Sequence, residues 1–193
     1  TYVLNPLIMP FVGVLFLLFF DEYYYLLLNP SQKFYILGFI FLITFVLPFL
    51  VTLLLKNLGR IGSLEMQTRE ERKLPILATA FIYVALFFML GNVTGYEKIK
   101  LFILATTIAI IVSGFITNYF KISIHMTGVG GVVGLLAYMA TYSLFQITPL
   151  LIGSVVFSGL VGAARLQLKA HTPTQVYTGF GFGFSVVFLI HLF

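Results

Sequence analysis

The chain has no cysteine and very few charged residues. The absence of cysteine excludes disulfides, thiolate nucleophiles and cysteine-ligated metal sites. Charged residues account for 9% of the 193 positions, whereas a soluble domain carries roughly 25% because it must cover its surface. The same shortage argues against a secreted module, a disordered linker and a nucleic-acid binder. The composition therefore predicts an integral membrane protein.

Apolar residues make up 60% of the chain. A bilayer core of about 30 Å needs roughly 20 apolar residues per helix. Long apolar runs without alternation favour helices over strands. We therefore predict an all-α, multi-pass transmembrane helical bundle of six or seven spans, forming one membrane domain over residues 1–193. The candidate spans are Val3–Phe20, Phe34–Leu55, Ile76–Leu90, Ile99–Tyr119, Val129–Phe145, Leu150–Ala164 and Val176–Phe193, of which the third and sixth are short.

Charge is distributed unequally between the two faces that these spans imply. Alternating the loops places eight cations and three glutamates on one face, and three cations with three acidic residues on the other. The first face, called the basic face below, thus carries the whole net charge of +5. Either the positive-inside rule or the binding of an anionic ligand explains it, so the orientation stays open. Its cations are Lys56, Arg60, Arg69, Arg72, Lys73, Lys121, Arg165 and Lys169.

Glycine is concentrated in the last three candidate spans. Small residues let membrane helices approach backbone to backbone, and Gly179 and Gly183 form one GxxxG step. We therefore expect a tightly packed C-terminal bundle next to the polar loops.

Two histidines lie on the basic face near the starts of candidate spans. His125 follows Ser123 by two positions, and His171 follows Arg165 by six. Ionisable groups near a bilayer are rare without a function. Snorkelling at the interface could explain one of these residues, but together they favour a site. His191, which lies on the opposite face and has no polar neighbour in sequence, is expected to be interfacial.

This pattern resembles the type-2 phosphatidic acid phosphatase family, whose helical core is shared with vanadium haloperoxidases. The third motif of that family is Ser-Arg-x5-His-x3-Asp. Arg165, His171 and Gln175 reproduce its spacing, with Ala164 in the serine position and glutamine in the aspartate position.

The other two family motifs are matched in part. The second, Pro-Ser-Gly-His, keeps its serine and histidine in Ser123 and His125. The first, Lys-x6-Arg-Pro, has no residue match ahead of Pro75, but three cations precede that proline. They are Arg69, Arg72 and Lys73. The resemblance implies a phosphatase-like, haloperoxidase-like core in residues 56–193, preceded by two spans in residues 1–55.

The resemblance also implies a chemistry: hydrolysis of a lipid phosphate monoester or diphosphate without metal or cofactor. His171 would attack phosphorus and form a phosphohistidine, His125 would protonate the leaving alcohol, and Gln175 would orient His171. The phosphate-binding residues would be Arg165, Ser123, Lys121, Arg69, Arg72 and Lys73.

Gln175 is the main departure from the family pattern. Its carbonyl can accept a hydrogen bond from an imidazole, but it carries no charge to stabilise an imidazolium. In a serine-protease triad the change from carboxylate to amide costs about 10⁴ in turnover. The alternative hypothesis is therefore a catalytically silent relative that binds anionic lipid headgroups or partner helices.

The sequence leaves the substrate open among phosphatidate, phosphatidylglycerophosphate, a polyprenyl diphosphate and a lipid A phosphate. The expected partners are that lipid and the bilayer, with no nucleic acid, and the oligomeric state stays open. The expected location is a bacterial cell (inner) membrane. Intramembrane transferases that hold metal on aspartate clusters do not fit, because Asp21 is the single aspartate. A small transporter or lipid-binding scaffold still fits the composition.

Overall fold

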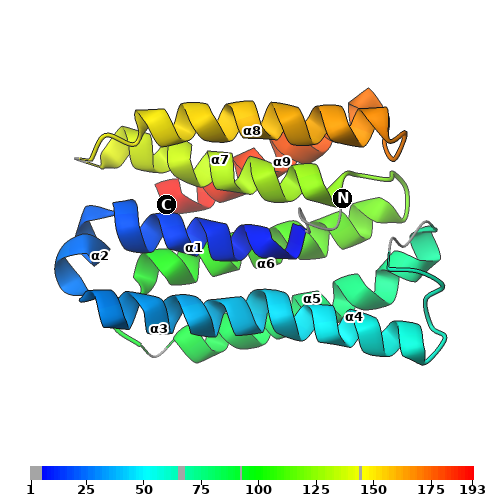
Figure 1. The fold of residues 1–193 in the computed structure, drawn as a ribbon, viewed down its shortest axis with the longest axis horizontal. Coiled ribbons are helices and arrows are strands. Elements are labelled where there is room, and N and C mark those ends of the chain that lie inside the picture. Colours follow the sequence, from blue (N-terminus) through cyan, green and yellow to red (C-terminus); the bar gives the residue numbers. More distant parts are fainter. Residues whose placement is uncertain (1–5, 65–67, 92, 144) are drawn as a thin grey trace.

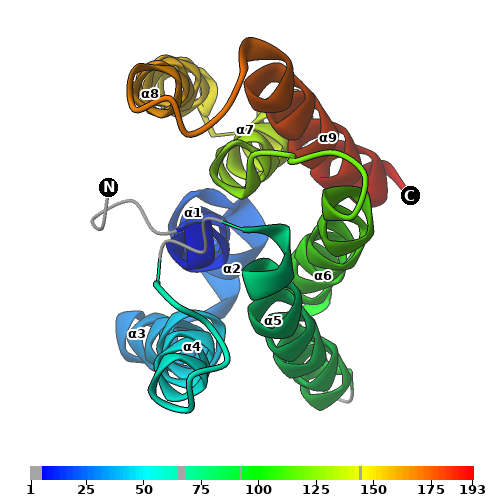
Figure 2. The same cartoon turned by 90° about the vertical axis from the view of Figure 1, so that its right-hand side faces the viewer.

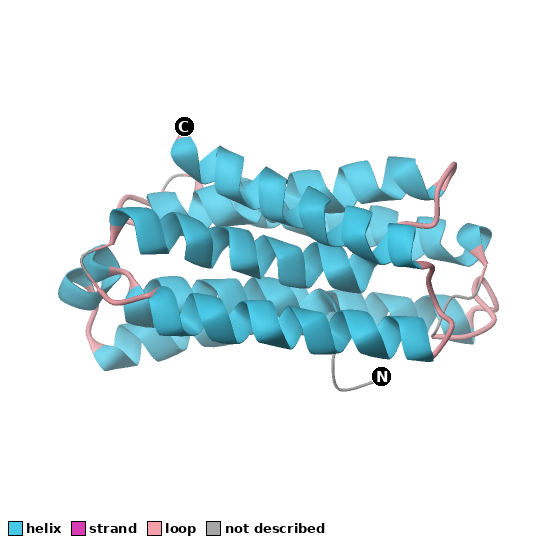
Figure 3. Cartoon of the chain, turned by 90° about the horizontal axis from the view of Figure 1, so that it is seen from above, coloured by secondary structure: helices cyan, strands magenta, loops and turns pink. Residues whose placement is uncertain are grey.

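The computed structural model describes residues 6–64, 68–91, 93–143 and 145–193, and the side chain of Arg69 also lies outside the described part. Within these residues the regular structure is entirely helical, with the helices side by side along one long axis and the connections at both ends (Figures 1 and 3). The predicted all-α, multi-pass bundle is confirmed. The elements are η1 Pro6–Ile8, α1 Met9–Phe20, α2 Glu22–Leu27, α3 Pro30–Phe41, the π-helical turn η2 Leu42–Val46, α4 Leu47–Asn57, α5 Arg69–Leu90, α6 Glu97–Thr117, α7 Ile124–Tyr142, α8 Thr148–Gln167 and α9 Pro173–Leu192.

Six spans in the described part of the chain are long and apolar enough to cross a bilayer. One of them runs through α3, η2 and α4 as Pro30–Asn57, and the other five are α5 to α9. The first predicted span corresponds to a shorter apolar helix, Pro6–Phe20. These spans make the chain an integral membrane protein.

The two segments that looked short in the sequence are full-length helices. α5 begins at Arg69 and has 22 residues, about 33 Å at 1.5 Å per residue. Its charged first turn hid this from the hydropathy pattern, although Thr68 and Glu71 form a capping box there. α8 extends to Gln167, beyond the predicted end at Ala164.

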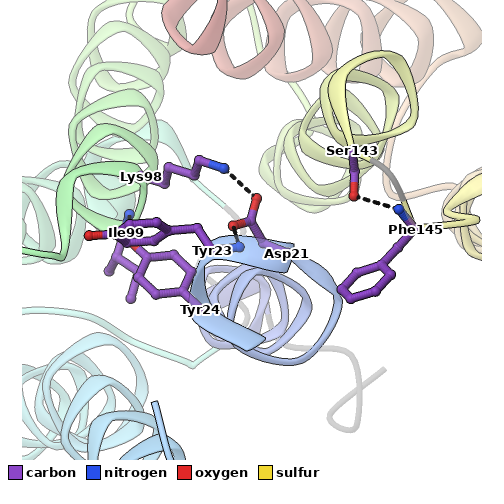
Figure 4. A network of polar contacts seen from close by, with 7 residues as sticks. All are labelled: Asp21, Tyr23, Tyr24, Lys98, Ile99, Ser143 and Phe145. Carbon is purple, nitrogen blue, oxygen red and sulfur yellow. Dashed lines mark hydrogen bonds and ion pairs between the residues drawn. The ribbon is translucent and has the colours of Figure 1, made fainter. Parts of the chain in front are cut away.

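The connections fall at the two ends as the charge pattern predicted. The α4–α5, α6–α7 and α8–α9 connections share one end, which is the basic face (Figure 1). At the opposite end, Asp21 caps α2 by accepting a hydrogen bond from the Tyr23 backbone and pairs with the Lys98 ammonium at 2.6 Å (Figure 4). The Tyr24 hydroxyl accepts a hydrogen bond from the Ile99 backbone. Polar groups at that end therefore hold helices together.

A proline couples α4 to α5. Pro48 has no N–H, so the carbonyl of Thr44 loses the partner that a regular helix would provide. The hydroxyl of Tyr83 in α5 donates to that carbonyl at 2.9 Å. Because Tyr83 is fully buried, this bond is shielded from water and fixes the position of α5 against the first long span.

Backbone contact between α7 and α9 holds the C-terminal half together. A Cβ at Gly179 would lie 2.7 Å from a backbone carbonyl oxygen of the α7 start, and a Cβ at Gly183 would overlap the Thr127 carbonyl. Gly130 and Gly134 of α7 meet the backbone of α9 in the same way. The expected tight packing is confirmed for α7 and α9. It is wrong for α8, which is exposed over most of its surface and whose Gly153 and Gly159 would have nothing within 4 Å of an added Cβ.

We expect Gly183→Leu to separate α7 from α9 and to destabilise the protein. Overpacking costs about 1–3 kcal/mol in a core, and more where a backbone rather than a side chain must move. Gly181→Leu is the matched control, because a Cβ at Gly181 has nothing within 4 Å. Thermal unfolding in detergent should show a large decrease in melting temperature for Gly183→Leu and little change for Gly181→Leu. Equal melting temperatures for the two variants would contradict this packing.

Candidate functional site

A cavity of about 740 Å³ extends from the basic end into the interior between α1, α4, α5, α6 and α7. Figure 2, which looks onto that end, shows these helices around a common centre. The walls come from both predicted parts of the chain, since Met9 and Thr52 line them along with residues of 56–193. The basic and histidine side chains on the lining are Arg72, Lys121, His125, Arg165, Lys169 and His171.

A tight helix end brings Arg165 and His171 to the same cavity. The Ala170 N–H bonds the carbonyl of Arg165, and the Lys169 N–H bonds that of Leu166, which is the Schellman pattern. Lys169 has a φ of 51°, a left-handed backbone conformation that is uncommon for residues other than glycine. The turn reverses the chain within a few residues, so the last turn of α8 and the loop before α9 line one wall.

The start of α9 holds the imidazole of His171. Thr172 and Gln175 form a capping box: the Gln175 N–H donates to the Thr172 hydroxyl, and the Thr172 N–H donates to Gln175 Oε1. The His171 Nδ1 lies 3.0 Å from the same Oε1. Because a backbone N–H can only donate, the atom facing it is the amide oxygen, and Nδ1 must carry a proton to bond it. This tautomer leaves a lone pair on Nε2.

Burial and surrounding charge keep His171 neutral. Burial lowers its pKa below the usual 6.5, the hydrogen bond to Gln175 opposes this, and Arg165, Arg72 and Lys121 lower it further. At neutral pH the imidazole is therefore uncharged, which is the state that a nucleophile or a general base requires.

His125 lies close to the same group of cations. It is the second residue of α7, and its electrostatic neighbours include Arg165, His171 and Arg72. α7 and α9 both begin at this end, so the positive ends of two helix dipoles add to the charge of the arginines. Helix N-termini beside cations are a favourable environment for a phosphate group.

Three of the predicted site residues do not line the cavity. Ser123, the N-cap residue of α7, is fully buried, and Lys73 is exposed on α5. Gln175 lines an adjoining hollow of about 550 Å³, which shares Lys121, Lys169 and His171 with the cavity. Arg69 begins α5, but its side chain lies outside the described residues.

No described carboxylate lines the cavity. The carboxylate of Glu71 accepts hydrogen bonds from the backbones of Gly62 and Thr68. The acceptor for His171 is therefore Gln175. Among the described residues, no three histidine, aspartate or glutamate side chains are grouped as metal ligands.

Sequence reasoning missed two features. The capping box at Thr172 and Gln175 follows the S/T-x-x-E/Q signature and was readable in the sequence. The hydroxyls on the cavity wall, among them Tyr83 and Ser113, carry no sequence signal because they belong to four different helices. His191, in the last turn of α9, is buried, and its Nδ1 lies 2.8 Å from the Val187 carbonyl.

Comparison of this chain with protein-family models, with curated protein sequences and with solved structures finds no match.

Proposed function

We propose that this protein is a membrane-embedded lipid phosphate phosphatase that works through a phosphohistidine and without a metal. The observation that carries the proposal is the convergence of His125, His171 and Arg165 on one cavity. The fixed tautomer of His171 supports it, since Nδ1–H bonded to Gln175 leaves Nε2 able to attack.

In the proposed reaction, His171 Nε2 attacks phosphorus as the bond from phosphorus to the lipid oxygen breaks. His125 supplies the proton that this oxygen needs to leave as an alcohol. A water molecule then attacks the phosphohistidine, gives its proton to His125, and inorganic phosphate leaves. Arg165, Arg72 and Lys121 stabilise the negative charge that spreads over the phosphoryl oxygens in both steps.

The shape of the cavity supports a lipid as the substrate. Beyond the cations its walls are largely apolar, with Phe49, Ile76, Phe102, Ile110 and Val187 among the lining residues. A cationic end joined to an apolar interior matches a phosphate attached to hydrocarbon. The proposed location is the inner membrane of a bacterial cell. The helical spans favour it over the outer membrane, whose spans are barrels.

The direct test is release of inorganic phosphate by the purified protein in EDTA. The substrates are diacylglycerol phosphate, phosphatidylglycerophosphate, a polyprenyl diphosphate and a lipid A phosphate in mixed micelles. Release from at least one of them supports the proposal. A folded protein that releases phosphate from none of them contradicts it.

A second candidate function is a non-hydrolytic lipid-binding protein. The observation that favours it is the amide of Gln175, which orients His171 but carries no charge beside it. This candidate predicts saturable binding of lipid phosphates without any release of phosphate.

The His171 imidazole should titrate below pH 6.5. Its pKa is lowered chiefly by burial, so the neutral form persists to more acidic pH than in an unfolded chain. The measurement is the ring chemical shift of ¹⁵N-labelled histidine against pH, with His171→Ala used to assign the signal. Arg165→Gln removes a nearby positive charge and should move the midpoint upward. A midpoint above 6.5 in the unaltered protein would refute the buried environment.

A further inference from the structure

One hydroxyl on the cavity wall differs from all the others. Ser113, in α6, is 2% exposed, lines the cavity, and its Oγ has no hydrogen-bond partner in the described structure. A buried hydroxyl without a partner is costly and is uncommon in proteins. Ser113 could have bonded the carbonyl one turn back along its own helix, as Thr117 does with the Ser113 carbonyl.

Every other hydroxyl that the described residues place on the lining already donates to a backbone carbonyl. Tyr83 donates to Thr44, as described above. The remaining donor and acceptor pairs are Thr52 with Pro48, Thr79 with Pro75, Thr106 with Ile103 and Thr127 with Ser123. Because their hydroxyl hydrogens already bond backbone carbonyls, these residues have no free donor to offer a ligand. Ser113 alone among the described lining hydroxyls has a donor to offer.

The level of Ser113 along the cavity suggests what it binds. α6 runs towards the basic end, so its lining residues pass from Phe102 and Thr106 in the interior through Ala109 to Ser113. Ser113 is thus the α6 lining residue nearest the cations, one turn before the helix ends at Thr117. A donor between a phosphate site and an apolar interior faces the part of a lipid that links its phosphate to its chains.

We infer that Ser113 is a specificity-determining residue that donates a hydrogen bond to an ester carbonyl of the bound lipid. The placement of the phosphate at the basic end rests on the proposed function. Ester-linked glycerolipid phosphates carry a carbonyl acceptor a few bonds from the phosphate. Dialkyl ether analogues lack that carbonyl, and polyprenyl phosphates have hydrocarbon in its place. A lipid A phosphate presents a sugar, which would need several donors and acceptors rather than one.

The test is binding of three phosphonates that cannot be hydrolysed, so that turnover does not enter. They are a diacyl glycerol phosphonate, its dialkyl ether and a polyprenyl phosphonate, each titrated in detergent against the full chain by isothermal calorimetry. The protein should bind the diacyl compound about five-fold more tightly than the ether, the size of one neutral hydrogen bond. Ser113→Ala should abolish that difference and leave ether binding unchanged.

Ser158→Ala is the matched control, because Ser158 is a buried serine in α8 away from the cavity. It should keep the five-fold preference. Ser113→Ala removes an unpartnered hydroxyl, so the variant should fold and melt no lower than the unaltered protein. Equal binding of ester and ether, or a loss in Ser113→Ala that is the same for all three ligands, overturns the inference.

The same samples separate this inference from the proposed function. An ester preference that depends on Ser113, without phosphate release from any of the four lipid phosphates, sustains the inference and defeats the phosphatase. Phosphate release without an ester preference supports the phosphatase and overturns the inference about Ser113.

Discussion

His171→Ala is expected to lower the rate of phosphate release by about 10⁴-fold or more, because removal of a nucleophile eliminates the covalent route. The effect should fall on kcat. Arg165 and Arg72 remain on the cavity wall, so binding of a lipid phosphate should survive the substitution. The measurement is release of phosphate from the best substrate of the panel at saturating concentration, together with capture of acid-labile phosphate on the protein after a quench at high pH.

Lys73→Ala is the control for this experiment. Lys73 is exposed on α5 and does not line the cavity, so this variant should release phosphate at the unaltered rate and still show the acid-labile phosphate on the protein. If His171→Ala retained a tenth of the activity, the phosphohistidine mechanism would be wrong even if phosphate were released.

Gln175→Glu is expected to increase kcat by about 10² to 10⁴, with the upper value set by the cost of the reverse change in a serine-protease triad. Glutamate has the same length as glutamine, so its carboxylate can accept from both Thr172 N–H and His171 Nδ1–H. It also completes the commonest form of the capping box, and the N-terminus of α9 stabilises its charge. The negative charge stabilises the imidazolium character that His171 gains as it attacks.

The same charge should raise the pKa of His171, so the acidic limb of the pH profile should move to higher pH. The gain in rate is therefore measured above that limb, where His171 is neutral in both proteins. Gln175→Met is the paired variant, since it keeps the length of the side chain but can accept neither hydrogen bond. A rate that falls in Gln175→Glu would indicate a site adapted to the amide, and an unchanged rate would mean that Gln175 does not orient the reacting histidine.

The parts of the site that could be predicted from the sequence are those held by hydrogen bonds between residues close in sequence. The capping boxes at Thr68 and Thr172 join residues three positions apart, so their signatures are contained in short segments. The spacing of Arg165, His171 and Gln175 is equally local, and the four positions from His171 to Gln175 allow their side chains to form a hydrogen bond. The predicted start of the α5 span, Ile76, was wrong, because the helix begins at Arg69 with a charged turn that a hydropathy pattern does not detect.

The composition, the long apolar runs and the distribution of charge in this sequence by themselves determined a bundle of membrane helices with one basic end. Bilayer thickness sets the length of every span, and the connections must then alternate between two ends. Only the tertiary structure decided that His125 and His171 share a cavity, that Ser123 does not line it, and that Ser113 does. Which face of a helix turns inward depends on how its neighbours pack against it, and the glycines of α7 and α9 set that packing through contacts between residues about 50 positions apart.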